Sequence, residues 1–209
     1  MKNGWDIVRH RVAIAGRVFD AGTGKPLSDA EVVIGKMPDA FKKRLEAVMM
    51  PYANRPSTAV ERPDKTRSRP DGLFYFLDLP DGTYSVRASV PSYGNRYGKA
   101  EQPATVSRDA NGDTKIPFLR CALQPTHVKG KVTGTGQESG VALARVRVKG
   151  SGERGFTDAQ GQYTVAGIEP GKRTLLVSAQ GYRTESQAFT LQEAGASHTL
   201  NFTLTRENG

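Results

Sequence analysis

The amino-acid sequence predicts an all-β protein built from two tandem antiparallel β-sandwiches, the first with a short helical insertion. The main observation is a rhythm of turn glycines and alternating apolar residues that occurs twice, in residues 69–94 (RPDGLFYFLDLPDGTYSVRASVPSYG) and 158–182 (DAQGQYTVAGIEPGKRTLLVSAQGY). Gly72 aligns with Gly161, and large apolar residues follow both glycines at the same spacing. The 23 glycines and 12 prolines indicate short strands with frequent turns. A repeated rhythm of this kind indicates a duplicated β module.

The repeat extends upstream, and there it locates the domain boundaries. Residues 12–35 match residues 126–150, but at a larger offset than the downstream segments. The first copy therefore contains extra residues, which we place at about 36–66. We predict a first domain over residues 1–124 and a second over residues 125–209, each long enough to form a core of its own.

Each copy reads as strands because apolar and polar residues alternate. In AEVVIG, for example, Ala30, Val32 and Ile34 are expected to face inward. The same alternation predicts five core positions in each domain. These are Val18, Val32, Phe74, Phe76 and Val86 in the first, and Val132, Val146, Tyr163, Val165 and Val177 in the second.

Two motifs in the first copy, GRVFDAGTGKPLSDAEVVI and PDGLFYFLDLPDGTYSVRASVPSY, resemble the carboxypeptidase regulatory-like domain. In the second copy GKV, ARVRV and TDAQGQYTVAGIEPGKRTLLVSAQGY are similar to the same family. The resemblance implies a prealbumin-like (transthyretin-like) β-sandwich for each copy. Two positions depart from the family pattern: Ser92 stands where a glycine is usual, and Arg173 where a tyrosine is usual. The motif residues are structural, so the resemblance implies the fold and leaves the function open.

The sequence contains no constellation of residues that would support catalysis. His10, His127 and His198 lie in separate segments, and none has the spacing of a zinc-binding helix motif. The lone cysteine, Cys121, lies in an apolar alternation, which predicts a buried and unreactive thiol. We therefore expect a protein that is not an enzyme, with no catalytic residues, no metal and no cofactor.

One turn has an alternative interpretation as a calcium loop. Asp109, Asn111 and Asp113 place oxygen-bearing side chains at alternate positions, as at the start of such a loop. The distal glutamate that would complete the site is missing, and Asn111 followed by Gly112 already predicts a hairpin turn. The sequence favours the plain turn and leaves calcium binding open.

The insertion contains the only helical pattern. In PDAFKKRLEAVMM, Asp39 is a candidate cap and Pro51 a stop, and the apolar residues recur at helical spacing. Such a short helix needs a surface to pack on, either its own sandwich or a partner protein. For the second case the candidate partner-binding residues are Phe41, Lys42, Lys43, Arg44 and Leu45.

The chain is basic, with a formal net charge of +9, and more than half of this excess lies in residues 36–69. A second group of basic residues occupies outward positions of predicted strands in the second copy. If those strands pair, the group forms one basic sheet face that attracts anionic partners. Its candidate contact residues are Lys129, Lys131, Arg145, Arg147 and Lys149. No nucleic-acid-reading motif accompanies them, so nucleic acid is the least favoured partner.

These observations favour a non-catalytic structural or adaptor protein that presents rigid β-modules within a larger assembly, in a cell envelope or a phage-tail-like particle. The alternative is a module that binds a glycan or another anionic polymer, for which Tyr52, Tyr93 and Tyr97, with Trp5, are the candidate aromatic residues. No stretch is apolar enough to span a membrane, and the N-terminus does not resemble a secretory signal. We expect a cytoplasmic protein or a particle assembled in the cytoplasm, or an envelope protein if a signal has been removed.

Overall fold

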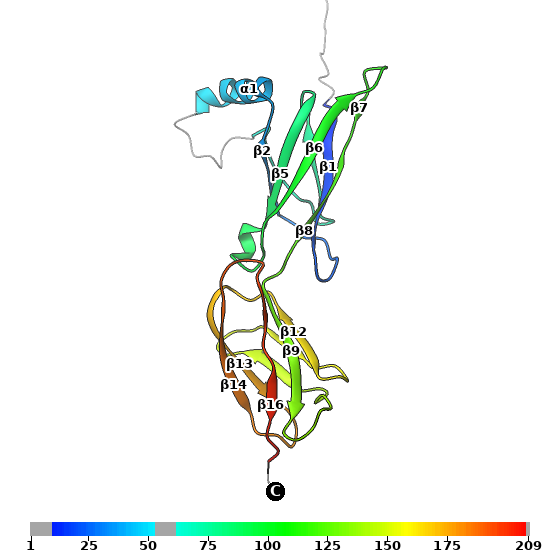
Figure 1. Ribbon diagram of the computed structural model, residues 1–209. Coiled ribbons are helices and arrows are strands. Elements are labelled where there is room, and N and C mark those ends of the chain that lie inside the picture. Colours follow the sequence, from blue (N-terminus) through cyan, green and yellow to red (C-terminus); the bar gives the residue numbers. More distant parts are fainter. Residues whose placement is uncertain (1–9, 53–61, 208–209) are drawn as a thin grey trace, which may run out of the picture. The chain divides into compact units, whose positions relative to one another are not determined.

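The computed structural model describes residues 10–52 and 62–207, which fold into two compact units (Figure 1). The first unit consists of Met1–Ser92 with Ala100–Ala122, and the second of Tyr93–Lys99 with Leu123–Gly209. The sequence placed the division after residue 124 and assigned residues 93–99 to the first domain. By its contacts that segment belongs to the second unit, although it lies between two strands of the first.

The first unit is a β-sandwich with one helix. Its strands are β1 (Val12–Asp20), β2 (Glu31–Lys36), β3 (Lys65–Arg67), β4 (Leu73–Leu77), β5 (Gly82–Ser89), β6 (Ala100–Arg108), β7 (Thr114–Lys115) and β8 (Phe118–Leu123). They form one sheet of order β4-β1-β8 and another of order β3-β2-β5-β6-β7. Helix α1 (Asp39–Met49) follows β2 and continues into a 3₁₀ turn over Met50–Tyr52.

The second unit has a corresponding arrangement of strands. They are β9 (His127–Gly134), β10 (Arg145–Val148), β11 (Arg154–Phe156), β12 (Gln162–Ala166), β13 (Gly171–Ser178), β14 (Glu185–Leu191), β15 (Ser197–Thr199) and β16 (Phe202–Leu204). One sheet has the order β11-β10-β13-β14, and the other has the order β12-β9-β15, with β16 also paired to β9. Both β15 and β16 run parallel to β9, which differs from the purely antiparallel pairing expected. The difference arises because the chain crosses from β14, in one sheet, to the edge of the other.

The core of each unit lies between its two sheets. All ten predicted core residues are buried, each with at most 4% of its surface exposed. In the first unit the ring of Phe74 packs edge-on against Phe76, with 6.1 Å between ring centroids. In the second, Tyr163 packs against Phe202 at 6.5 Å, and its hydroxyl donates to the Leu200 carbonyl oxygen. The period-two alternation therefore identified the core correctly.

The repeated turn glycines have one structural explanation in both units. Gly72 has a φ of +80° and Gly161 a φ of +76°, values that side chains other than glycine rarely adopt. A Cβ atom at either position would also lie 2.5 Å from a backbone oxygen, that of Val18 or Val132 respectively. The amides of the same two valines donate hydrogen bonds to the carbonyl oxygens of the two glycines, which holds the valine and the glycine close together. The rhythm shared by the two copies is thus a requirement of the backbone.

Helix α1 packs on its own unit, and its start differs from the prediction. The N-cap residue is Pro38, which makes no side-chain cap, and Asp39 is instead the first helical residue. A carboxylate in the first turn stabilises the helix, because it lies near the positive end of the helix dipole. Phe41 and Leu45 are buried, and the Phe41 ring meets Tyr84 edge-on at 6.0 Å. The helix is thus a cover over the first sandwich.

The insertion is shorter than expected at both ends. Strand β2 continues to Lys36 and β3 begins at Lys65, so residues at both limits of the expected range 36–66 belong to the sheet. Asp64 is also buried, and its carbonyl oxygen accepts a hydrogen bond from the Ile34 amide. The extra residues therefore lie between these two strands. No helix in the described part of the chain is both long enough and apolar enough to cross a bilayer.

Candidate functional site

The residues most capable of chemistry serve structural roles. His10 contacts the Asp78 carboxylate at 2.5 Å, His127 contacts the Pro125 carbonyl oxygen at 3.0 Å, and His198 lies against the Phe189 ring. Cys121 is fully buried, and burial raises the pKa of its thiol to about 11. Within residues 10–52 and 62–207, no three His, Cys, Asp or Glu side chains lie close enough together to hold a metal ion.

The turn considered for calcium is closed by hydrogen bonds between the Asp109 side chain and the backbone of the turn. One oxygen of Asp109, Oδ1, accepts hydrogen bonds from the amides of Asn111 and Asp113, both at 2.9 Å. Asp158 does the same in the second unit, with the amides of Gln160 and Gln162. These are turns in which a carboxylate replaces a backbone acceptor. The geometry accounts for Asp109 without a cation.

The candidate partner-binding residues on α1 divide into two groups. Phe41 and Leu45 are buried against the sandwich, so their side chains are not available to a partner in this conformation. Lys42, Lys43 and Arg44 are exposed. The outward face of the helix is thus cationic, which makes it suited to steering association rather than to forming an apolar contact.

The predicted basic face of the second unit is in fact two faces. Lys129 and Lys131 lie on β9, whereas Arg145 and Arg147 lie on β10, and these strands belong to different sheets. Lys149 follows the end of β10. The expectation of one basic face was wrong because it assumed that β9 and β10 pair, while the two strands face outward on opposite sides of the sandwich.

The aromatic residues considered for glycan binding are divided between the two units. Tyr93 and Tyr97 pack against each other in the second unit, with ring centroids 5.8 Å apart. Tyr52 belongs to the first unit, at the end of the turn after α1. Trp5 lies outside the described residues.

Sequence reasoning missed an outward face of the first unit where arginines alternate with aromatic rings, on the sheet β4-β1-β8. Arg17 of β1 lies opposite Leu73 of β4. On β8, Phe118 is 58% exposed. A cavity of about 320 Å³ lies on the outward side of these strands. Its lining comprises Arg17, Phe19, Gly24, Asp71, Leu73, Phe118 and Arg120. We call this the arginine–aromatic face.

The guanidinium groups of this face are held in place by neutral groups. Arg120 stacks over the ring of Phe19 at 5.1 Å, and Arg69 stacks over Tyr75 at 5.2 Å. Arg17 donates from Nε to the carbonyl oxygen of Asp71 at 3.0 Å. Among the described residues, none of these three arginines has a carboxylate within ion-pair distance. Within the described part of the chain, these guanidinium groups are therefore ordered without forming an ion pair.

The other sheet of the first unit provides a contrast. The arginines on its strands are paired with carboxylates: Arg67 with Asp29, Arg87 with Glu101, and Arg108 with Asp81. A paired surface of this kind is typical of a solvated face. Among the described residues, the two sheets thus differ in how their arginines are held: Arg17 and Arg120 of the sheet β4-β1-β8 have no ion pair.

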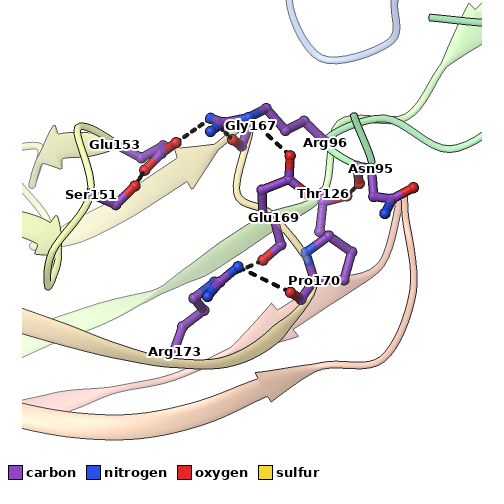
Figure 2. A network of polar contacts seen from close by, with 9 residues as sticks. All are labelled: Asn95, Arg96, Thr126, Ser151, Glu153, Gly167, Glu169, Pro170 and Arg173. Atoms are coloured by element: carbon purple, nitrogen blue, oxygen red, sulfur yellow. Dashed lines mark hydrogen bonds and ion pairs between the residues drawn. The ribbon is translucent and has the colours of Figure 1, made fainter. Parts of the chain in front are cut away.

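A second polar cluster, missed in the same way, joins the segment Tyr93–Lys99 to the rest of the second unit (Figure 2). Arg96 forms ion pairs with Glu153 and, at 3.4 Å, with Glu169. It also donates to the carbonyl oxygen of Gly167 at 2.8 Å. Glu153 is 12% exposed, so its charge depends on Arg96 for compensation. Every contact is within the unit, which makes this cluster structural.

Comparisons with known proteins agree with the fold. Residues 127–205 match the family model of the carboxypeptidase regulatory-like domain, which is less than half of the chain. The match covers the strands of the second unit. No curated protein matches the chain.

Solved structures with similar folds are distant. The chain has 15% identity with the Bacillus anthracis TIE protein over 93% of its own length, with a TM-score of 0.37, and it spans 34% of that chain. With the shaft pilin SpaA of Lactobacillus rhamnosus GG it has 11% identity, covering 93% of this chain and 96% of the pilin, with a TM-score of 0.41. A type II cohesin–X-dockerin complex from Acetivibrio cellulolyticus matches at 15% identity, over 39% of this chain and 58% of that chain, with a TM-score of 0.32. At these identities the likeness concerns the β-sheet fold alone.

Proposed function

We propose that this protein is a non-catalytic structural or adaptor module, which binds other protein subunits of a larger assembly through an outward sheet face. The single observation that carries the proposal is the arginine–aromatic face. Arginine and aromatic side chains are the types enriched at the energetic centres of protein interfaces. Here Arg17 and Arg120 are ordered beside Phe118, a large ring that is mostly exposed.

The internal chemistry of the chain supports a structural role as well. The buried polar side chains are used to close the fold: Ser68 bridges Leu27 and Ala30, and Thr157 bridges Val141 and Ala144 in the same manner. In the described residues no buried side-chain nitrogen or oxygen lacks a hydrogen-bond partner.

We also propose that the first unit is a second copy of the domain matched by residues 127–205. The equivalent roles of Gly72 and Gly161, and the corresponding strand orders of the two units, support a duplication. The assembly we envisage is a cell-envelope complex or a phage-tail-like particle. Cys121 is the only cysteine, so disulfide usage favours neither compartment.

The test of this function is the size of the native species. In an extract of the source cells, the chain is expected to elute from a sizing column well above the monomer position. The variant Arg17→Gln/Arg120→Gln should shift toward the monomer, and Lys129→Gln/Lys131→Gln, which removes the same charge from the second unit, should not. A wild-type chain that elutes as a free monomer would contradict the proposal.

A second candidate function, binding of an anionic glycan, is favoured by a groove of about 650 Å³ on the sheet β12-β9-β15. Lys129 lies opposite Thr164 of β12 and Thr199 of β15, and Lys131 lies opposite Gln162. Hydroxyl and amide side chains beside lysines suit a ligand with both hydroxyls and carboxylates. An oligogalacturonate that binds the wild type and not Lys129→Gln/Lys131→Gln, in calorimetry, would support it. If Arg145→Gln/Arg147→Gln weakened oligogalacturonate binding as much as the lysine variant does, the binding would be general charge attraction instead.

A further inference from the structure

The cavity of the arginine–aromatic face has a lining that selects among anionic partners. Its walls are apolar, from Phe19, Leu73 and Phe118, and two guanidinium groups, of Arg17 and Arg120, flank them. A ligand that fits must present a negative charge and an apolar group side by side. Because the arginines are already held by the Phe19 ring and by the Asp71 carbonyl oxygen, little side-chain entropy is lost when such a ligand binds.

The lining argues against a saccharide in this cavity. It contains no hydroxyl and no amide side chain, and its one side-chain acceptor is the carboxylate of Asp71. One oxygen of that carboxylate already accepts the Leu73 amide at 2.9 Å. Sugar hydroxyls would lose water here without gaining partners, which is unfavourable. In this respect the cavity differs from the groove of the second unit.

The lining argues against single-stranded nucleic acid as well. Nucleic-acid bases bind such faces by stacking on free aromatic rings. One face of Phe19 is covered by Arg120, and one face of Tyr75 by Arg69. Phe118 is the remaining exposed ring on this part of the sheet, and one ring does not form a stacking platform.

We propose that this cavity binds an acidic peptide segment of a partner protein, with a carboxylate between Arg17 and Arg120 and an adjacent aromatic or aliphatic side chain against Phe118 and Leu73. Carboxylates are the groups that guanidinium binds with two parallel hydrogen bonds. The inference rests on the proposed function, and it adds the chemistry of the partner. Asp71, the one acid in the lining, opposes binding and leaves a net positive cavity.

The test is fluorescence anisotropy with the purified full chain and a labelled peptide of three Glu-Phe-Asp-Leu repeats, at about physiological ionic strength. Arg17→Gln/Arg120→Gln is expected to weaken binding about tenfold or more, because two charge-assisted contacts are lost. Lys172→Gln/Arg183→Gln removes the same charge from exposed positions outside both cavities and should weaken binding less than about twofold. Asp71→Asn keeps the acceptor for the Leu73 amide and removes the opposing charge, so it should tighten binding about threefold.

Outcomes of three kinds would overturn the inference. The first is equal weakening in the two double variants, which would indicate general attraction to a basic protein. The second is a wild-type chain that does not bind the peptide, or an Asp71→Asn variant with unchanged affinity. The third is tighter binding of oligo(dT) or oligogalacturonate than of the peptide, lost in Arg17→Gln/Arg120→Gln. Asp71→Asn keeps the inference testable even if the arginine variant does not fold.

The inference and the proposed function can fail separately. A native chain that elutes as a free monomer would overturn the proposed function, whatever the peptide does. A chain that assembles in the native extract but ignores the acidic peptide would overturn this inference alone.

Discussion

Phe74 occupies the space that a side chain at Gly16 would need. A Cβ atom built on Gly16 would lie 2.4 Å from the Cζ atom of the Phe74 ring. The ring is fully buried and packs edge-on against Phe76. One glycine and one phenylalanine on neighbouring strands are therefore a matched pair, and the first sheet packs closely because β1 carries no side chain at this point.

Phe74→Ala is expected to lower the free energy of unfolding of the first unit by about 3–5 kcal/mol, because it leaves a cavity in a close-packed core. Urea denaturation, followed for each unit by tyrosine fluorescence and circular dichroism, measures the change. Phe118→Ala is the control: that ring is 58% exposed, so a change within about 0.5 kcal/mol is expected. Equal losses in the two variants would mean that Phe74 is not part of the core.

Cys121 is expected to be unreactive in the folded protein. Burial raises the pKa of its thiol to about 11, so at neutral pH it is protonated, and it is also inaccessible. Ellman's reagent should label it at the rate of unfolding, and rapidly in strong denaturant. Rapid labelling of the native chain would show that β8 opens locally.

Arg96→Met should destabilise the second unit by about 1–2 kcal/mol, since it leaves the largely buried Glu153 without a counter-ion. The additional change Glu153→Gln should recover part of this loss. Arg145→Met, which removes an exposed arginine of the same unit, is the matched control. A loss in Arg96→Met no larger than in the control would mean that the network contributes nothing measurable.

At the scale of elements, α1 shows how an insertion is held on a sandwich. The helix has only 11 residues, too few to be stable in isolation, and its apolar face is small. Phe41 and Leu45, one turn apart, bury that face, while Val48 remains 46% exposed. The contact between Phe41 and Tyr84 thus attaches the helix to β5.

Phe41→Ala is expected to release α1 before it unfolds the sheets. Backbone amides of the helix should lose most of their protection in hydrogen exchange, while those of β5 keep theirs. Val48→Ala should leave the protection of the helix unchanged. If Phe41→Ala preserves helix protection and weakens only assembly, the helix face would be a docking element rather than a cover.

At the scale of the whole molecule, the chain passes between the two units at 92/93, 99/100 and 122/123. The middle segment contributes backbone hydrogen bonds to the second unit as well as Arg96. The Thr126 amide donates to the Arg96 carbonyl oxygen at 2.8 Å, and the Gly98 amide donates to that of Gln124 at 2.9 Å. A fragment that begins at residue 125 lacks all of these contacts.

The fragment 125–209 should still unfold cooperatively, because both of its sheets and its core are complete. It should be less stable than the second unit of the full chain by about 2–4 kcal/mol, from the lost hydrogen bonds and ion pairs. Circular dichroism melts of the fragment, the full chain and the Arg96→Met variant test this. A fragment as stable as the second unit in the full chain would show that Tyr93–Lys99 is dispensable.

The sequence by itself determined the parts of this protein that depend on local periodicity. Alternation predicted every core position that we named, and the spacing of Gly72 and Gly161 predicted the turns that both form, because strand geometry and positive φ are properties of short segments. Only the tertiary structure decided which strands share a sheet. Pairing separates Lys129 from Arg145, brings Phe118 and Arg120 beside Arg17, and assigns Tyr93–Lys99 to the second unit. These are contacts between residues far apart in the chain, and a surface made from several strands leaves no periodic signal in any one of them.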